Sequence, residues 1–358
     1  MKQIHIVGCG QVGSILSKFL IKKGYSIKVY SPINNHDCQN PWGWVRRITL
    51  NQDERISKFV GKKLITMNKK YRKQGPMIIS TSCNKRKGIW DSWITNRPKS
   101  DAKILNQDEA IYYNVTQGKH HLLCDSKDFL FDFGKQKQEN IQYIQKKIDN
   151  NFINDDIVGI LEKNKKIIKL QGMETNYPIE KDDVVIFCIG NQTNLLFQVP
   201  IMGVRLAYLT VKTKSKSKYI GNWSDHSSIQ YFEEYTKIGC GMNGSLDFLP
   251  PIMYWYRYLP FLKKNNYSNY TNMKLQMIQA CKERGIEFPD DYSSCTVDIT
   301  PNFLPYLKHT HENSIVICGM SGSVFTAYEL FFLEHILKMI DGEKNSIFTE
   351  KSVKSYLY

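Results

Sequence analysis

The distribution of apolar and polar residues predicts a nucleotide-binding unit at the N-terminus. A strand predicted over residues 2–7, with its apolar run at 4–7, leads into GCGQVG (8–13), and apolar residues at helical spacing continue over 12–23. Gly24 is a natural stop for this helix, and a second apolar run covers 26–30. A strand, a glycine turn, a helix and a strand in this order are typical of the first βαβ unit of a Rossmann-type domain.

Two further buried strands, each followed by a glycine, occur in DDVVIFCIG (182–190) and NSIVICG (313–319). The second precedes a helix that we expect to end near Asp341. Further helices are predicted over about 53–74, from 138 up to a strand pair at 157–161 and 166–170, and over about 260–284. Short strands are predicted in PMIIST (76–81), AIYYNV (110–115) and KHHLLCD (119–125), and alternation over 200–250 indicates antiparallel strands.

These patterns predict a mixed α/β protein with two domains. A Rossmann-like, discontinuous dinucleotide-binding domain would comprise residues 1–75, 140–200 and 286–358. A second, antiparallel-sheet substrate domain would comprise residues 76–139 and 201–285.

The glycines of GCGQVG have separate expected roles. Gly8 permits the tight turn, Gly10 lets the backbone approach a pyrophosphate, and Gly13 allows close packing of helix and strand. The pyrophosphate would lie against the first helical residues, Gln11 and Val12. A glycine turn that serves packing alone is the alternative. Ser31 stands where such units place a ribose-binding acid, so its hydroxyl would contact the ribose without charge.

Composition excludes several classes of protein. The net charge is +15, but the lysines form dispersed clusters that we interpret mainly as solvated surface, with a steering field for an anionic substrate or carrier as the alternative. No nucleic-acid-binding motif accompanies them. No apolar run reaches the ~20 residues of a membrane span, and no signal peptide is recognisable, so we expect a cytoplasmic protein without a membrane or nucleic-acid partner. The nine cysteines include no CxxC pair, and no metal site is expected.

Four further stretches follow in a characteristic order: WGWVRRI (42–48), CIGNQTNLL (188–196), TPNFLPYL (300–307) and GMSGSVFT (319–326). With GCGQVG, they make the chain resemble the D-amino-acid oxidase and glycine/sarcosine oxidase superfamily of FAD-dependent amine oxidases, nearest to the monomeric sarcosine oxidase branch. The resemblance covers nearly the full length. It implies FAD as cofactor and oxidation of a C–N bond in a small amine-type or imino/amino-acid-derived substrate by hydride transfer to flavin N5.

The resemblance also implies roles for individual residues. Arg46 would lie beside the flavin, as a catalytic or substrate-holding group, with Arg47 next to it. Cys295 stands five residues before Thr300, where the branch attaches FAD through a thioether; a buried structural thiol is the alternative. The remaining implied cofactor contacts are Gly190, Gly319, Ser321, Gly322, Ser323, Val324, Phe325 and Thr326.

Departures from the family pattern bear on the reaction. Thr326 replaces the lysine that we associate with oxygen activation, which favours, as an alternative, a flavin dehydrogenase or subunit with another electron acceptor. Thr49 and Val297 replace arginines that bind a free amino-acid carboxylate. The substrate is then either not a simple free amino acid or is bound by other groups.

Arg46, Arg47 or Arg205 could bind the carboxylate from another direction, and Thr49 stays a candidate substrate residue. Trp44 and Tyr254, with Trp42, Trp255 and Tyr256, could line a pocket for an aromatic amine, and these aromatics could equally be core residues. We expect a specialised biosynthetic amine substrate, either anionic or carrier-bound. A non-catalytic flavoprotein relative is a further alternative, and an NAD-dependent dehydrogenase a more distant one. The sequence predicts no oligomeric state.

Overall fold

The computed structural model describes residues 2–32, 42–45, 69–96, 100–115, 117–212, 217–240, 247–249, 270–288, 293–300, 305–319 and 329–344. Residues 42–45, 69, 191, 202–207, 240, 247–249, 270–273, 293–297 and 299 are described as backbone only.

A six-stranded sheet forms the first half of the molecule, with strand order β20-β21-β13-β1-β2-β9. All neighbours are parallel except the β20–β21 hairpin. Its strands are β1 (Gln3–Val7), β2 (Ser26–Tyr30), β9 (Phe152–Ile153), β13 (Val184–Phe187), β20 (Tyr306–His311) and β21 (Ser314–Cys318).

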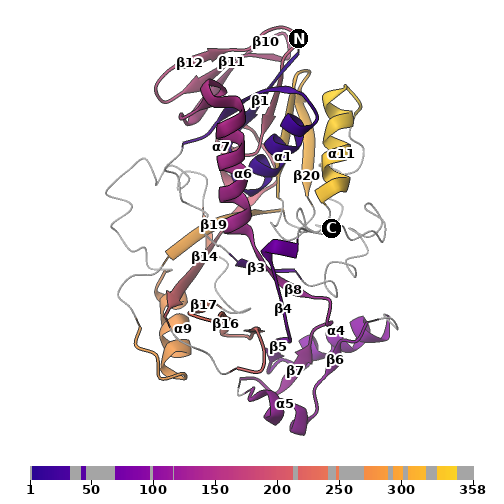
Figure 1. Ribbon diagram of the computed structural model, residues 1–358, viewed down its shortest axis with the longest axis vertical. Helices are drawn as coiled ribbons and strands as arrows, with labels where there is room; N and C mark the ends of the chain where they lie inside the picture. The colour runs from indigo at the N-terminus through magenta and orange to yellow at the C-terminus, as the bar shows by residue number, and fades with distance from the viewer. Residues whose placement is uncertain are drawn as a thin grey trace.

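Helices and a small second sheet cover the two faces of this sheet (Figure 1). The helices α1 (Gln11–Lys22), α6 (Phe133–Ile148) and α11 (Glu329–Ile340) share one core with Ile4 and Ile6 of β1. The opposite face packs Val7 and Phe187 against the sheet of β10 (Ile157–Lys163), β11 (Lys166–Gly172) and β12 (Asn176–Pro178).

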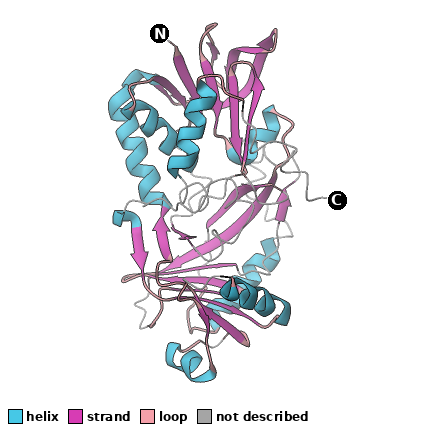
Figure 2. Cartoon of the chain, turned by 90° about the vertical axis from the view of Figure 1, so that its right-hand side faces the viewer, coloured by secondary structure: helices cyan, strands magenta, loops and turns pink. Residues whose placement is uncertain are grey.

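A nine-stranded sheet forms the second half (Figure 2). Its strands are β5 (Met77–Thr81), β6 (Lys103–Ile104), β7 (His120–Leu123), β14 (Met202–Val211), β15 (Gly221–Trp223), β16 (Ser227–Tyr231), β17 (Thr236–Cys240), β18 (Asp247–Leu249) and β19 (Ser293–Ile299). Helix α9 (Tyr270–Lys282) covers one face, where Met277 and Ala280 pack on Leu209, Ile229 and Ile238. Helices α4 (Asn84–Thr95) and α5 (Gln107–Tyr113) lie at the far end.

Short elements connect the two halves. A three-stranded sheet joins β3 (Trp42–Val45), β8 (Phe129–Asp132) and β4 (Arg72–Gln74), and β8 runs directly into α6. The short helices are η1 (Lys69–Tyr71), η2 (Asp149–Asn151), η3 (Gly190–Gln192) and α7 (Thr193–Leu196).

The mixed α/β architecture predicted from the sequence is confirmed, and two local predictions are wrong. AIYYNV does not form a strand, because Asn106 and Glu109 cap one another's backbone N–H groups and start the helix α5. The helix expected to reach residue 74 gives way to β4, which pairs with β8. Strand β19, in the segment 286–358, pairs with β14 in the nine-stranded sheet.

A buried polar chain lies inside the six-stranded sheet. The His5 side chain, 2% exposed, contacts the Tyr30 hydroxyl through Nδ1 at 2.9 Å and the Asp183 carboxylate through Nε2 at 3.0 Å. Asp183 also accepts the backbone N–H groups of Gln3 and Glu180. All these groups are satisfied when Nε2 of a neutral His5 donates to Asp183 and Tyr30 donates to Nδ1.

This chain makes stability depend on pH. Burial lowers the pKa of His5 from its ordinary value of 6.5, although Asp183 opposes the shift. Just below pH 6.5 the unfolded chain therefore binds a proton that the folded chain does not, so stability is present above pH 6.5 and falls as the pH drops. We expect His5→Gln to lose about 1–3 kcal/mol at pH 7.5 and to remove that part of the pH dependence. Urea unfolding at pH 7.5 and 5.5 checks this; equal pH slopes in both proteins would contradict it.

Candidate cofactor site

The N-terminal glycine turn lies at the topological switch point of the six-stranded sheet, where successive strands are added on opposite sides of β1. From β1 the chain moves through α1 to β2 on one side, whereas β13 pairs with β1 on the other side. The turn after β1 therefore lies beside the turn after β13, and the Cys188 N–H donates to the Val7 carbonyl at 2.8 Å. Crevices at such switch points, outside the carboxyl ends of strands, are where open α/β sheets bind ligands.

Two glycines of GCGQVG are required by packing. Gly8 has φ +91°, and a Cβ there would lie 2.7 Å from the Cys188 carbonyl oxygen. A Cβ on Gly13 would lie 2.0 Å from the Gly8 carbonyl oxygen and 3.3 Å from Cβ of Cys188. Neither position accepts a side chain unless the backbone moves, so both glycines hold α1 against the ends of β1 and β13.

Gly10 has a different environment. A Cβ on Gly10 would meet no atom of the described chain within 4 Å. Gly10 is the N-cap of α1, which has no side-chain cap and no acidic residue in its first turn. Its open surface is therefore next to the unpaired N–H groups and the positive end of a helix. This arrangement fits a pyrophosphate, as the sequence predicts.

The side chains of Gln11 and Val12 are used within the protein. Gln11 donates through Nε2 to Oε1 of Gln136 at 2.6 Å, which ties α1 to α6. Val12 packs on the core beneath the helices. The backbone N–H groups of these two residues lie at the helix N-terminus, where the pyrophosphate is predicted.

Ser31 follows β2 at the same edge of the sheet. Its Oγ accepts the Cys9 N–H at 3.2 Å, and its own N–H donates to the Ile153 carbonyl at 3.0 Å. The hydroxyl therefore braces the glycine turn and keeps its proton for a further acceptor. Contact of this hydroxyl with a ribose stays a prediction.

Two other predicted cofactor residues form left-handed turns after neighbouring parallel strands. Gly190 has φ +58° and begins η3 after β13, and Gly319 has φ +65° directly after β21. The carboxylate of Asp298 accepts the Gly319 N–H and lies 3.5 Å from where a Cβ of Gly190 would be. The sequence analysis did not single out Asp298; an aspartate inside the β-type run SSCTVDI was the available signal.

Three residues singled out in the sequence lie on β14 or on its neighbour β19, and the pairing of these strands gives their backbone positions. Cys295 and Val297 of β19 lie opposite Leu206 and Val204, and Arg205 lies opposite Thr296 of β19 and Asp247 of β18. Trp44 of β3 is opposite Leu130 of β8. These are backbone positions, so the thioether at Cys295 and the substrate roles of Arg205 and Trp44 stay predictions.

The other predicted site residues lie outside the described residues, and their roles stay predictions. They are Arg46, Arg47, Thr49, Tyr254, Ser321, Gly322, Ser323, Val324, Phe325 and Thr326.

A buried lysine was missed by the sequence analysis. Lys237 on β17 is 4% exposed, and its Nζ lies 4.2 Å from the centroid of the Tyr208 ring. Its neighbour Ile238 packs under α9, so alternation directs Lys237 to the other face of the sheet. Burial raises the pKa of Asp132, at the start of α6, and the charge of Lys237 acts to lower it, so the lysine lies within electrostatic range of this junction between the two halves.

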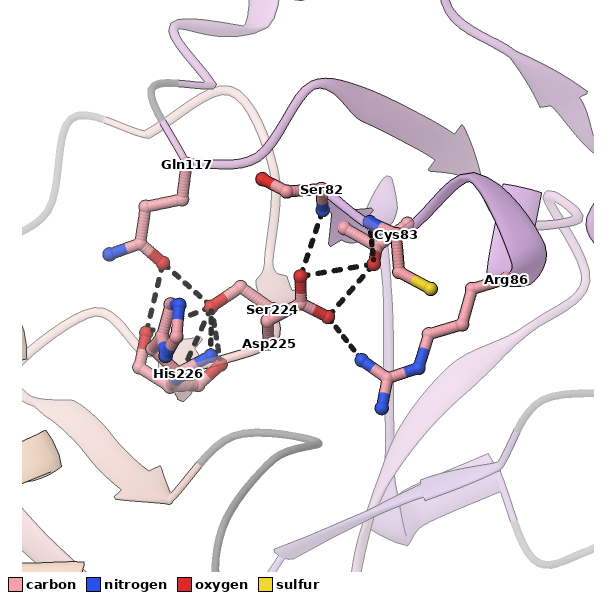
Figure 3. A network of polar contacts seen from close by, with 9 residues as sticks. Ser82, Cys83, Arg86, Gln117, Ser224, Asp225 and His226 are labelled. Carbon is pink, nitrogen blue, oxygen red and sulfur yellow. Dashed lines mark hydrogen bonds and ion pairs between the residues drawn. The ribbon is translucent and has the colours of Figure 1, made fainter.

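A second buried polar network, far from this edge, is structural. In Figure 3, Asp225 binds the Thr81 hydroxyl at 2.9 Å, the Ser82 N–H at 2.8 Å and the Arg86 guanidinium, at the start of α4. Figure 1 places α4 at the opposite end of the molecule from β10–β12. Because its carboxylate oxygens are occupied by the protein's own donors, this cluster is not a candidate ligand site.

In the part of the chain that the structure describes, no three His, Cys, Asp or Glu side chains are arranged to hold a metal ion. None of the helices described there is long and apolar enough to cross a bilayer.

The two glycines give a matched pair of variants. Gly13→Ala should destabilise the protein without cofactor by about 1–3 kcal/mol, because the methyl group must displace the Gly8 carbonyl. Gly10→Ala should change stability by less than about 0.5 kcal/mol, because its site is open. Urea unfolding measures both; equal losses would show that the turn is packed differently.

Comparison with known proteins identifies the fold. No protein-family model and no curated sequence matches the chain. Among solved structures, L-proline dehydrogenase from P. horikoshii is 14% identical, with 97% of this chain and 95% of that chain covered and a TM-score of 0.65. Fructosamine oxidase (Amadoriase II) from Aspergillus fumigatus is 11% identical, with 100% of this chain and 91% of that chain covered and a TM-score of 0.72. Glycine oxidase from Bacillus cereus is 12% identical, with 97% of this chain and 99% of that chain covered and a TM-score of 0.68.

The similarity extends over nearly the whole of each chain, both sheets included. The chain therefore has the same fold as these three oxidoreductases, as its sequence motifs predicted.

Proposed function

We propose that this protein is an FAD-dependent oxidoreductase that oxidises a C–N bond of a small amine or amino-acid-derived substrate. The observation that carries the proposal is the open N-terminus of α1, which has no side-chain cap and lies at the switch point of the six-stranded sheet. The chain as a whole has the fold described above. The named structures that share the fold include a proline dehydrogenase, a fructosamine oxidase and a glycine oxidase.

The chain's own residues would hold FAD in an extended position along the carboxyl edge of the six-stranded sheet. The backbone of Gly10, Gln11 and Val12 would receive the pyrophosphate, and the Ser31 hydroxyl would donate to a ribose oxygen. A bound flavin supplies the two-electron acceptor, at N5, for the hydride from the substrate carbon.

The substrate proposal follows from charge. The positions of Thr49 and Val297 lack the arginines of the amino-acid-oxidising relatives, while the chain as a whole carries a net charge of +15. An anionic amine attracted by the overall field, or one attached to an acidic carrier, agrees with both observations better than a free amino acid does.

Lys237 bears on the electron acceptor. A buried cation stabilises negative charge that develops when oxygen accepts electrons, and a lysine desolvated in the junction is more effective than one in water. Lys237 of β17 is the residue that we propose for this role, which makes an oxidase the first candidate although position 326 is a threonine. A dehydrogenase with another acceptor is the second candidate, since proteins of both kinds share this fold.

The first test of the proposed function is the visible spectrum. The purified protein should show flavin absorption or gain it on addition of FAD, and acid precipitation should leave the colour in the pellet because of a thioether at Cys295. Cys295→Ala should release the colour into the supernatant, whereas the control Cys83→Ala, at an exposed thiol, should not. A soluble colour in wild type would refute the thioether; failure to bind FAD would refute the function.

The oxygen reaction can be tested without knowing the substrate. We expect Lys237→Met to slow reoxidation of photoreduced flavin in aerated buffer by about 100-fold, because one pre-positioned charge is lost. Lys127→Met removes an exposed lysine of the same half and should have no effect. Stopped-flow absorbance measures the rate. Slow reoxidation in wild type that Lys237→Met leaves unchanged would instead support the dehydrogenase.

A further inference from the structure

The two left-handed turns at the cofactor edge belong to one sheet, but the side chain between them comes from the other. Gly190 and Gly319 follow the neighbouring parallel strands β13 and β21, whereas Asp298 lies on β19, which pairs with β14 in the nine-stranded sheet. Asp298 is opposite Gly203, near the end of this pairing.

The carboxylate binds the Gly319 turn and lies beside the Gly190 turn. One oxygen accepts the Gly319 N–H, and the other is 3.5 Å from where a Cβ on Gly190 would lie. The Gly190 turn is also closed from within, because the Thr193 hydroxyl donates to the Gly190 carbonyl at 2.6 Å. Both glycines are thus fixed in backbone conformations that other residues adopt only with strain.

A carboxylate in this position is costly. Burial raises the pKa of Asp298, while the N–H groups of Gly319 and Asp298 itself act to lower it. Its charge also raises the pKa of the neighbouring Cys318 thiol, after the larger effect of burial. No cationic side chain among the described residues contributes to the pKa of Asp298. The Gly319 N–H therefore fixes this carboxylate between the two turns.

We infer that Asp298 is a positioning residue: its carboxylate holds the Gly190 and Gly319 turns in the arrangement that receives the flavin half of the cofactor. This role rests on the proposed function. Asp298 acts through the two turns and needs no contact with the reacting atoms. It couples the sheet that would bind substrate to the backbone that would bind FAD.

The test compares FAD affinity among variants that remain folded. Asp298→Ala should weaken FAD binding by about tenfold or more, because the Gly319 N–H loses its acceptor. Asp298→Asn keeps an acceptor oxygen at the same place and should bind within about threefold of wild type. Asp298→Ser, which is too short to reach Gly319, replaces the alanine variant if that variant does not fold. In each case Cys295 is also changed to Ala, so that binding is reversible.

A matched control separates this role from stability alone. Asp183 is also buried, accepts backbone N–H groups and directly precedes β13, but lies at the opposite end of that strand from Gly190. Asp183→Ala should lower the free energy of unfolding and leave the FAD dissociation constant of the folded protein unchanged. Flavin fluorescence quenching gives the constants, and the shape of the bound flavin's absorption spectrum is a second readout that we expect Asp298→Ala to alter.

The outcomes are distinct. Wild-type affinity and spectrum in Asp298→Ala, or equal losses in Asp298→Asn and Asp298→Ala, would overturn the positioning role while leaving the proposed function intact. If the protein with an unchanged Asp298 takes up no FAD, the proposed function fails and this role fails with it. Weakened binding in Asp298→Ala with retention in Asp298→Asn and Asp183→Ala supports it.

Discussion

The contact between the Gly13 backbone and the Gly8 carbonyl is the constraint on which the cofactor edge depends. It brings the first turn of α1 against the ends of β1 and β13, with no space for a Cβ. Since α1 begins there, its N-terminal N–H groups are directed to the crevice at the switch point. The Ser31 hydroxyl supports the same turn from β2. The edge is therefore shaped largely by backbone atoms.

What could be predicted from the sequence was local. The strand, turn and helix at the N-terminus follow from glycine chemistry and apolar spacing within thirty residues, and β2 begins and ends as predicted. The strand expected at AIYYNV failed because a capping box at Asn106 outweighs the β-propensity of its aromatic residues. Lys237 and Asp298 were missed because pairing between distant strands, which no local pattern encodes, creates their environments.

Strand β14 connects three residues of the proposed site. It pairs with β19 along one edge and with β17 and β18 along the other. The position proposed for covalent attachment, the carboxylate beside the glycine turns and the buried lysine are therefore supported by a single set of backbone hydrogen bonds. A shift of this strand would therefore move all three positions together.

The burial of three cysteines at the cofactor edge has a chemical consequence. An oxidase releases peroxide beside its own side chains, and peroxide attacks thiolates rather than thiols. Burial raises the pKa of Cys9 to about 12 and also raises those of Cys188 and Cys318, so at neutral pH all three stay protonated. Tight packing beneath the glycine turn thus makes this edge chemically resistant to the reduced oxygen that the proposed reaction would produce there.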